Sequence, residues 1–455
     1  MSWDLIVIGS GQAGVPLATR FAAKDKRVLL VERGVLGGTC VNTGCTPTKT
    51  MIASARAAHV ARTAGRLGVR TGEVVVDLSA VVDRKEAIVR RWREGVAAKL
   101  TQARDRLEVR RGHARFVGER EIEVEGRRER GETVVIDVGA RPAVPPIPGL
   151  PSIPWLDNRG AMDLRKLPQH LLVLGGGYIG CELGQAFRRF GSQVTIVDHH
   201  EHLLSREDSD VSQAIEAVFR TEGIGLALGA GVDSVASGEG RVTLRLASGR
   251  ELRGSHLLVA AGRKPNTDDL GCEAAGVALD GKGFVVVDDD YQTTALGIYA
   301  VGDAAGGPQF THSSWDDHRI LFDLLVGRGT RHRSSRLVPW SVFTDPQVAG
   351  VGLSVRQAEA RGIPFETATM PFGHVARAIE LDEQAGTMKL LLEPSSERIL
   401  GVFLVGAEAG ELIHVFVTLM QAGASARAVV DAEFVHPTFA EGLQSLVMRL
   451  PRYAL

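Results

Sequence analysis

The chain has 455 residues, of which 44% are hydrophobic and 24% charged, so it is long enough for roughly two to four domains with apolar cores. Its formal net charge of −1 gives no electrostatic reason to expect binding to nucleic acid or to an anionic membrane. No apolar run reaches the roughly 18 residues of a membrane span, and the start MSWDLIVIGSG lacks a basic signal-peptide region, so we expect a cytoplasmic protein without transmembrane helices.

The first predicted unit is a nucleotide-binding βαβ segment. An apolar strand, LIVIG, leads into a glycine-rich turn with Gly9, Gly11 and Gly14, an alanine-rich helix follows, and a second strand, RVLLVE, ends at Glu32. The glycines allow a pyrophosphate to approach the helix N-terminus, and the acid can bind ribose hydroxyls. A glycine pattern with its strand, helix and acid is strong evidence for a dinucleotide site.

The next stretch, GGTCVNTGCTPTKT, contains two of the four cysteines, Cys40 and Cys45. The other two stand alone, so the spacing does not suit a zinc site, and a redox pair is the better interpretation. In a regular helix, Cα atoms five residues apart lie about 8 to 9 Å apart, whereas a disulfide spans roughly 4.4 to 6.8 Å. The pair therefore needs an irregular helix start, which the flanking glycines and Pro47 favour.

A second dinucleotide unit follows a proline-rich crossover at residues 134 to 149. The strand and turn LLVLGGGYIG contain Gly175, Gly177 and Gly180, and the next strand, VTIVD, ends at Asp198. The acid follows the first glycine by the same number of positions in both units. Two complete units predict two bound dinucleotides.

The rest of the chain contains two further strand-and-turn segments and a C-terminal region. HLLVAAGRKPNT places Gly262 in a turn, and IYAVGDAAG places Asp303 between an apolar strand and glycines, where its carboxylate can bind a sugar-like hydroxyl. The polar stretch RGTRHRSSR is then a natural linker. Beyond it, MKLLLE, ILGVFLVG and a helical pattern around 411 to 422 predict a mixed α and β domain.

In their order along the chain, GGTCVNTGCTPTK, GGGYIGCE, GRKPNT, AVGDAAG and HPTFAE resemble the FAD-dependent pyridine nucleotide-disulfide oxidoreductases. The resemblance covers essentially the whole chain, and the cysteine motif is its most specific part. It implies an α/β fold with two Rossmann-like domains and a C-terminal α+β dimerisation domain. FAD would bind residues 1–149 and 262–332, NAD(P) would bind 150–261, and 333–455 would form the dimer interface.

The resemblance also implies roles for individual side chains. Cys45 would be the charge-transfer thiol facing the flavin, and Cys40 the interchange thiol that meets the substrate. Lys49 matches a lysine beside the flavin, Glu182 matches its acidic partner, and Tyr178 matches an aromatic gate for the nicotinamide. Cys181, next to these residues, is interpreted as a small buried hydrophobic residue.

Near the C-terminus, His436 and Glu441 resemble the family's His–Glu pair, which reaches into the active site of the other subunit. A histidine held by a carboxylate can move protons near neutral pH, as thiol exchange requires. The resemblance therefore implies an obligatory homodimer with a shared active site.

Asp198 favours NADH over NADPH, because a carboxylate binds ribose hydroxyls and repels a 2′-phosphate. His199 and His200 complicate this preference, since protonated imidazoles can tolerate the phosphate. With Glu201 and His202 the segment also has the composition of a metal site, but its position at the end of a nucleotide strand makes that a minor alternative, and no metal is expected.

The expected function is transfer of electrons from NAD(P)H through FAD and the Cys40–Cys45 disulfide to a small disulfide or a soft metal ion. The cysteine motif is closest to mercuric reductase-like sequences, yet the tail LVMRLPRYAL lacks their cysteine pair, so efficient mercury reduction is not expected. Dihydrolipoamide dehydrogenase is the alternative, although Phe434 and Val435 differ from its usual residues before HPT. A hypothesis of another class is a flavoprotein redox sensor or a subunit of a larger complex that does not turn over.

Overall fold

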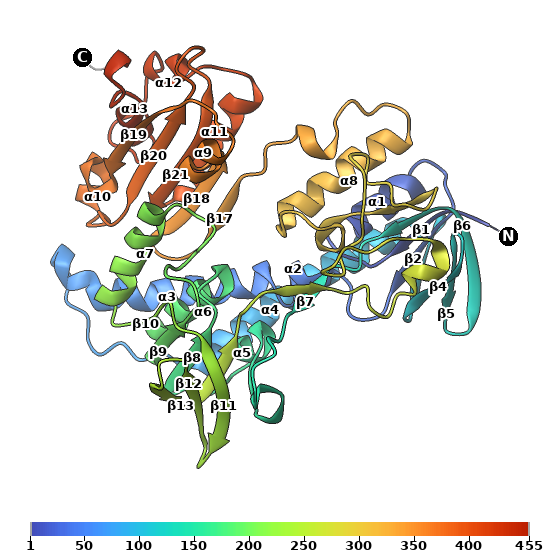
Figure 1. The fold of residues 1–455 in the computed structure, drawn as a ribbon, viewed down its shortest axis with the longest axis horizontal. Coiled ribbons are helices and arrows are strands. Elements are labelled where there is room, and N and C mark those ends of the chain that lie inside the picture. Colours follow the sequence, from blue (N-terminus) through green and yellow to red (C-terminus); the bar gives the residue numbers. More distant parts are fainter. Residues whose placement is uncertain (1, 454–455) are drawn as a thin grey trace. The chain divides into compact units, whose positions relative to one another are not determined.

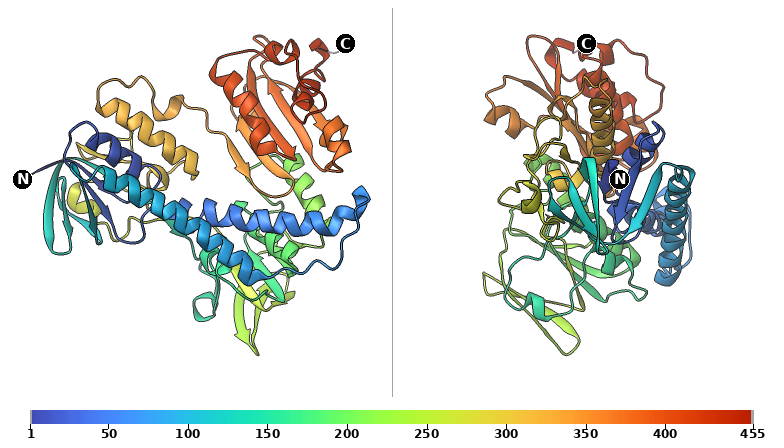
Figure 2. Two further views of the ribbon diagram at one scale, coloured as in Figure 1. Left: turned by 180° about the vertical axis from the view of Figure 1, so that it is seen from behind. Right: turned by 90° about the vertical axis from the view of Figure 1, so that its right-hand side faces the viewer.

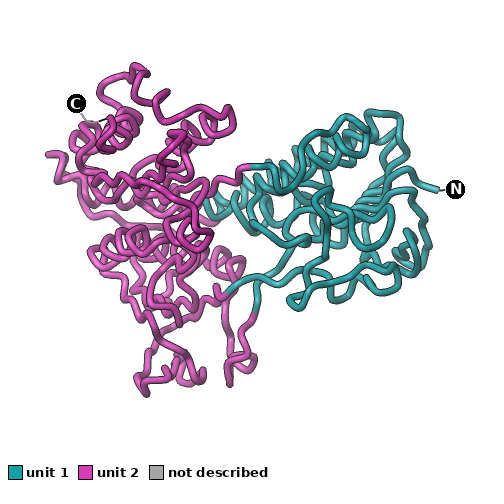
Figure 3. Tube along the Cα trace, turned by 45° about the horizontal axis from the view of Figure 1, so that its top comes forward, with its two compact units in different colours: residues 1–50, 83–143, 262–336 teal, residues 51–82, 144–261, 337–455 magenta. Residues whose placement is uncertain are grey.

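The structure is a computed structural model that describes residues 2–453. It divides the chain into two compact units, each assembled from three separate segments (Figure 3). Unit 1 comprises residues 1–50, 83–143 and 262–336, and unit 2 comprises residues 51–82, 144–261 and 337–455.

Unit 1 is built on a sheet whose parallel part has the order β3–β2–β1–β6, with β16 also paired to β6 (Figure 1). Strand interiors such as LIVI and VLLV are apolar, as expected for parallel strands covered on both faces. The first part of β6 turns away to pair antiparallel with β5, which pairs with β4. The strands are β1 (Trp3–Ile8), β2 (Val28–Glu32), β3 (Leu107–Arg111), β4 (Ala114–Gly118), β5 (Glu121–Val124), β6 (Arg127–Ile136) and β16 (Ile298–Ala300).

Helices pack on this sheet, and α1 contacts β1, β2 and α8. A short antiparallel pair, β7 and β15, lies where the chain leaves and re-enters the unit. The elements are α1 (Gly14–Ala22), α2 (Gly38–Asn42), α4 (Leu78–Gln102), α8 (Thr311–Leu325), β7 (Ala140–Pro142), β15 (Arg263–Pro265) and the 3-10 helices η3 (Cys272–Ala275), η4 (Gly302–Ala305) and η5 (Arg333–Ser335). Helix α3 (Cys45–Thr63) begins in unit 1 and continues into unit 2, where η1 (Ala64–Leu67) follows it. Helix α4 begins in unit 2 and continues into unit 1.

Unit 2 contains a second parallel sheet of order β10–β9–β8–β14, which repeats the strand order of the first. An antiparallel sheet, β11–β12–β13, accompanies it. The elements are η2 (Leu150–Ser152), α5 (Asn158–Met162), β8 (His170–Leu174), α6 (Tyr178–Phe190), β9 (Gln193–Val197), α7 (Ser209–Thr221), β10 (Gly225–Ala227), β11 (Val232–Gly238), β12 (Arg241–Leu246), β13 (Glu251–Gly254) and β14 (His256–Val259).

The C-terminal part of unit 2 is an antiparallel sheet of order β17–β18–β21–β20–β19. Helix α11 packs on β18 and β21, as the view from behind also displays (Figure 2). The elements are β17 (Trp340–Val342), β18 (Gln347–Gly352), α9 (Val355–Ala360), β19 (Glu366–Pro371), η6 (Phe372–His374), α10 (Ala376–Glu380), β20 (Thr387–Leu392), β21 (Ile399–Gly406), α11 (Ala409–Gln421), α12 (Arg427–Val430), α13 (Glu441–Val447) and η7 (Pro451–Tyr453).

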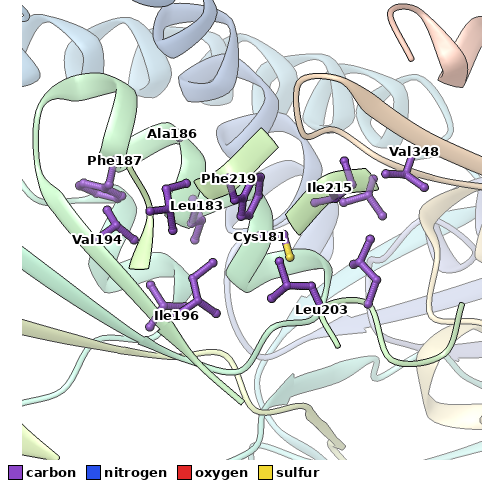
Figure 4. Close-up of a cluster of buried hydrophobic side chains, with 14 of the residues drawn as sticks. Cys181, Leu183, Ala186, Phe187, Val194, Ile196, Leu203, Ile215, Phe219 and Val348 are labelled. Atoms are coloured by element: carbon purple, nitrogen blue, oxygen red, sulfur yellow. The ribbon is translucent and has the colours of Figure 1, made fainter. Parts of the chain in front are cut away.

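The largest core cluster of unit 2 surrounds α6 (Figure 4). Phe187 and Phe219 are fully buried, and Cys181 is among the side chains that pack with them. Burial raises the pKa of the Cys181 thiol far above its usual range. Cys181 therefore fits the prediction of a small buried hydrophobic residue.

The two parallel sheets and the C-terminal antiparallel domain confirm the predicted fold class. Across the described residues, every helix is too short or too polar to span a bilayer.

Candidate redox site and nucleotide sites

Cys40 and Cys45 belong to two short helical segments rather than one. Helix α2 ends at Asn42, Thr43 leaves the helical conformation with a φ of −141°, and α3 begins at Cys45. Gly44 makes the turn possible, because a Cβ there would lie 2.9 Å from the carbonyl oxygen of Thr39. The structure thus contains the helix break that the cysteine spacing predicted.

Cys45 meets the N-terminus of another helix. Its Sγ lies 3.1 Å from Oγ1 of Thr311, the first residue of α8. Both cysteines are half-buried. The hydrogen bond with Cys45, together with burial, raises the pKa of the Cys40 thiol. Within the pair, the neighbouring Cys45 sulfur is thus the largest cause that disfavours a negative charge on Cys40.

Three groups around the pair favour an anionic sulfur. The Thr311 hydroxyl and the positive charge of Lys49 both act to lower the pKa of Cys40, against the larger effects that raise it. The N-terminus of an α-helix also carries partial positive charge, and Cys45 lies beside the start of α8. The sequence analysis did not identify Thr311, because its contact with Cys45 spans 266 positions of the chain.

The glycines of the first turn allow the backbone to pack closely against itself. A Cβ on Gly38 would lie 2.8 Å from the Cα of Gly11, and one on Gly14 would lie 2.1 Å from the carbonyl oxygen of Gly9. Glu32 closes the turn, since its Oε2 accepts hydrogen bonds from the backbone N–H of Ser10 at 3.0 Å and from its hydroxyl at 2.6 Å.

Asp303 and Arg263 lie at the same edge of unit 1. Arg263 forms an ion pair with Asp303 at 3.2 Å, and burial raises the pKa of the Asp303 carboxyl. The Nε of Arg263 is buried without a partner among the described residues. An unpaired buried donor next to a buried carboxyl is consistent with a polar ligand at this edge. Gly262, just before Arg263, has a φ of +127°, and its carbonyl accepts from the N–H of Ala143 at 2.9 Å.

These features fit FAD. The glycine turn with Glu32 can hold the adenosine end and the diphosphate, Asp303 can bind the hydroxyls of the linking chain, and the cysteine pair belongs to the same unit. FAD supplies a ring that accepts a hydride and passes electrons to a sulfur.

The second glycine turn repeats the first within unit 2. Asp198 accepts a hydrogen bond from the N–H of Gly176 at 2.6 Å, as Glu32 does from Ser10. A Cβ on Gly180 would lie 1.9 Å from the carbonyl oxygen of Gly175, so only glycine fits there, whereas Gly177 faces open space. The site fits the adenosine ribose of a second nucleotide.

The histidines after this strand contact the same carboxylate. Nδ1 of His200 lies 2.8 Å from Oδ1 of Asp198, and Nδ1 of His199 lies 3.4 Å from it. Candidate ligand atoms of these three residues lie within 4.8 Å of one another. His202 instead contacts Glu216 at 3.1 Å.

Tyr178 and Glu182 lie on the first turns of α6. Glu182 is buried, and its Oε1 accepts a hydrogen bond from the N–H of Phe343 at 2.8 Å. Tyr178 stacks on Trp340 with ring centroids 6.2 Å apart. Burial, with a smaller effect of Glu207, raises the pKa of the Tyr178 hydroxyl to about 12. Both residues belong to unit 2, whereas Lys49 belongs to unit 1.

His436 and Glu441 form the pair that the family resemblance implied. Nδ1 of His436 lies 2.9 Å from Oε2 of Glu441, and the histidine side chain is 71% exposed while the glutamate side chain is 20% exposed. The Glu441 carboxylate thus orients the imidazole through Nδ1, and Nε2 faces away from that carboxylate.

Comparison with known proteins identifies the family. Residues 3–317 match the family described as pyridine nucleotide-disulphide oxidoreductase, and residues 338–447 match its dimerisation domain. The chain belongs to the pyridine nucleotide-disulfide oxidoreductases. It is therefore an oxidoreductase that uses FAD and NAD(P)H, and its C-terminal domain supports a homodimer.

Several curated relatives match nearly the whole chain. A mercuric reductase of Staphylococcus aureus is 33% identical over 97% of this chain and 81% of its own length. A probable pyridine nucleotide-disulfide oxidoreductase, RclA of Escherichia coli, is 35% identical over 98% of both chains. A dihydrolipoyl dehydrogenase of Thermus scotoductus is 33% identical over all of this chain and 98% of its own.

Solved structures agree with this assignment. A Cu(II) complex of the flavoprotein disulfide reductase RclA from E. coli, described as HOCl-induced, superposes with a TM-score of 0.91 at 34% identity, covering 99% of this chain and all of that one. LpdA of Mycobacterium tuberculosis superposes with a TM-score of 0.88 at 28% identity, covering 98% of this chain and 99% of that one. The relatives thus include a mercuric reductase, which the cysteine motif suggested, and a dihydrolipoyl dehydrogenase, which HPT suggested.

Proposed function

We propose that Cys40 and Cys45 are the redox-active pair, and that the protein transfers two electrons from NADH to a small disulfide or to metal ions. The contact of Cys45 with Thr311 at the N-terminus of α8 carries this proposal. It gives one sulfur of the pair a positively polarised environment, as an electron-donating thiolate requires.

The chemistry at the sulfurs follows from their different environments. Cys40 attacks one sulfur of the acceptor disulfide, a mixed disulfide forms, and the first acceptor thiolate leaves and is protonated. Cys45 then attacks the Cys40 sulfur, which closes the Cys40–Cys45 disulfide and releases the second acceptor thiol. With a metal acceptor, the same two electrons reduce two Cu(II) ions to Cu(I), and two protons leave the pair.

Further residues of the chain support electron entry. Lys49 provides a positive charge close to the pair, and Glu182 is proposed as its acidic partner. Tyr178 is proposed to cover the flavin until the nicotinamide arrives. In this assignment residues 1–149 and 262–332 bind FAD, residues 150–261 bind the nicotinamide nucleotide and residues 333–455 form the dimer interface.

His436 is proposed as the base that removes and returns the protons of thiol exchange, acting on the active site of the other subunit. Its exposure and its contact with Glu441 suit a residue whose target lies on another chain. The active site would then be complete only in the dimer.

NADH is the proposed donor because Asp198 presents a carboxylate, held by Gly176, where a 2′-phosphate would have to bind. The cytoplasm is the proposed location, since it supplies NADH and keeps free thiols reduced.

Metal ions are proposed as acceptors beside disulfides, because relatives of similar identity include mercuric reductases and because the superposed RclA structure holds Cu(II). The alternative is dihydrolipoamide dehydrogenase activity, which the Thermus relative supports. A redox sensor without turnover is the third possibility, and the following measurement separates all three.

NADH oxidation by the purified protein is measured with lipoamide, with a small aromatic disulfide and with Cu(II), for the wild type, Cys45→Ala and Cys272→Ala. Cys272 is buried in η3 of unit 1 and serves as the matched control. We expect turnover with the aromatic disulfide and Cu(II) that Cys45→Ala loses and Cys272→Ala keeps. Fast lipoamide reduction alone would favour the dehydrogenase. No turnover with any acceptor would favour the sensor, and equal turnover in both variants would contradict the assignment of the pair.

A further inference from the structure

Asp137 places a buried carboxyl group beneath the first glycine turn. It follows the last residue of β6, is only 6% exposed, and its Oδ2 accepts a hydrogen bond from the N–H of Gly14 at 2.7 Å. A Cβ on Gly11 or on Gly14 would lie 2.8 Å from this oxygen. On its other side, a Cβ on Gly302 would lie 3.0 Å from Oδ1. The carboxyl is thus enclosed between the turn and η4.

Three acidic side chains act on the Asp137 carboxyl. Asp303 on η4, Asp317 on α8 and Glu32 on β2 all raise its pKa. Nearby cations are paired elsewhere, since Arg263 binds Asp303 at 3.2 Å and Arg336 binds Asp317 at 2.5 Å. Both arginines are therefore paired with other acids. Among the residues that the structure describes, the Asp137 carboxyl accepts its hydrogen bond from the N–H of Gly14.

The diphosphate of bound FAD would add further negative charge beside the first glycine turn. The diphosphate of a dinucleotide binds at the glycine turn and the N-terminus of the helix that follows it, here Gly9 to Gly14 and α1. An ionised Asp137 beneath the same turn would repel the diphosphate in a region shielded from water, where repulsion between like charges is strong. A neutral carboxyl can still accept the hydrogen bond of Gly14 through its carbonyl oxygen.

We propose that Asp137 is part of the FAD site as a protonated carboxylic acid, so that the holoenzyme holds FAD together with one proton on this side chain and releases FAD more readily when that proton is lost. The proposal rests on the FAD of the family and on the geometry of unit 1, and it is independent of the acceptor and of the cysteine pair.

The electrostatics agree with the geometry. Burial is the largest cause that raises the pKa of Asp137, and the three acids add to it, whereas the hydrogen bond from Gly14 lowers it. Together, these effects raise the pKa of Asp137 well above the ordinary range of an aspartate. The direction agrees with a carboxyl that keeps its proton to a higher pH than an exposed aspartate does and loses it as the pH rises further.

The test compares FAD release from the holoenzyme at about pH 6.5 and about pH 9.5 by the fluorescence of the released flavin. Asp137→Asn keeps an oxygen for Gly14 and cannot ionise. Asp323→Asn is the control, because Asp323 lies on the same helix as Asp317 but is half-exposed and pairs with Arg20. A second readout is the infrared carbonyl band of a protonated carboxylic acid in the holoenzyme at neutral pH.

We expect wild type and Asp323→Asn to release FAD about tenfold or more faster at the higher pH, and Asp137→Asn to change less than about threefold. The carboxylic acid band should be present in wild type and absent from Asp137→Asn. Parallel pH profiles in all three proteins, or a band that persists in Asp137→Asn, would overturn the proposal. If Asp137→Asn does not fold, release from wild type that is independent of pH still overturns it. Neither readout uses turnover, so the result stands apart from the proposed acceptor chemistry.

Discussion

The Sγ of Cys45 and the Oγ1 of Thr311 lie 3.1 Å apart, although 266 positions separate the residues in the chain. The contact brings the start of α8 to the start of α3. It gives the cysteine pair a hydroxyl partner and the positive end of a second helix.

Replacement of the Thr311 hydroxyl is expected to destabilise the thiolate form of Cys45. Thr311→Val removes a hydrogen bond to a charged group, which is worth about 1.5 to 3 kcal/mol, so turnover with a disulfide should fall about tenfold or more. Alkylation of the reduced enzyme should also require a higher pH. The control is Thr101→Val, whose hydroxyl bonds only to Ala97 within α4. If alkylation of Thr311→Val shows the same pH dependence as wild type, the Thr311 hydroxyl does not contribute to the reactivity of the cysteine pair.

His436→Ala should retain FAD and lose most disulfide turnover. A general base contributes about a hundredfold or more, whereas Glu441→Gln, which only weakens the orientation of the imidazole, should cost about tenfold. Bound FAD is measured by absorbance and turnover by NADH oxidation. His414→Ala on the exposed side of α11 is the matched control. Turnover that survives in His436→Ala would remove this residue from the mechanism.

Asp198→Asn should change the choice of nucleotide. Loss of the carboxylate removes the attraction for ribose hydroxyls and the repulsion of a 2′-phosphate, so kcat/KM should fall about tenfold for NADH and should not fall for NADPH. Asp233→Asn, at an exposed position of β11, is the control. A wild-type enzyme that already prefers NADPH would contradict the proposed role of Asp198.

Lys389 ties α7 to β20 within unit 2. Its Nζ lies 2.6 Å from Asp208 and 2.7 Å from Asp210, and both Lys389 and Asp208 are buried. Lys389→Met leaves Asp208 without its cation, which should cost about 3 kcal/mol or more and lower the thermal midpoint. Lys264→Met, at an exposed pair with Asp268, should change stability by less than about 1 kcal/mol.

The effect of Lys389 should depend on pH. Burial acts to raise the pKa of Asp208, but Lys389 and the backbone N–H groups of Val355 and Arg356 outweigh it, so the pKa is lowered from 3.8. A lowered pKa in the folded state means that this stabilisation is fully present above the unfolded value and is lost as the pH falls through the folded one. The difference in thermal midpoint between wild type and Lys389→Met should therefore shrink below about pH 3.8. A difference that stays constant down to the lowest pH at which both proteins fold would contradict the ion pair as its cause.

Local sequence was enough to predict the nucleotide turns and the helix break. The turn at Gly9 to Gly14 and its acid Glu32 belong to one βαβ unit, and the break between Cys40 and Cys45 follows from Gly44 and the reach of a disulfide. The His436–Glu441 pair was expected from the resemblance of HPTFAE to the family, and the two residues lie five positions apart. Short-range patterns of this kind are set by backbone geometry, which nearby residues control.

The sequence by itself therefore determined the family, the two dinucleotide units, the cysteine pair and the α/β fold. Only the tertiary structure brought Thr311 to Cys45, Asp137 to Gly14 across 123 positions, and Lys389 to Asp208 across 181. Burial and the charges that surround a carboxyl depend on strands and helices that are distant in the chain, so the chemistry of Asp137 emerges only when they pack together.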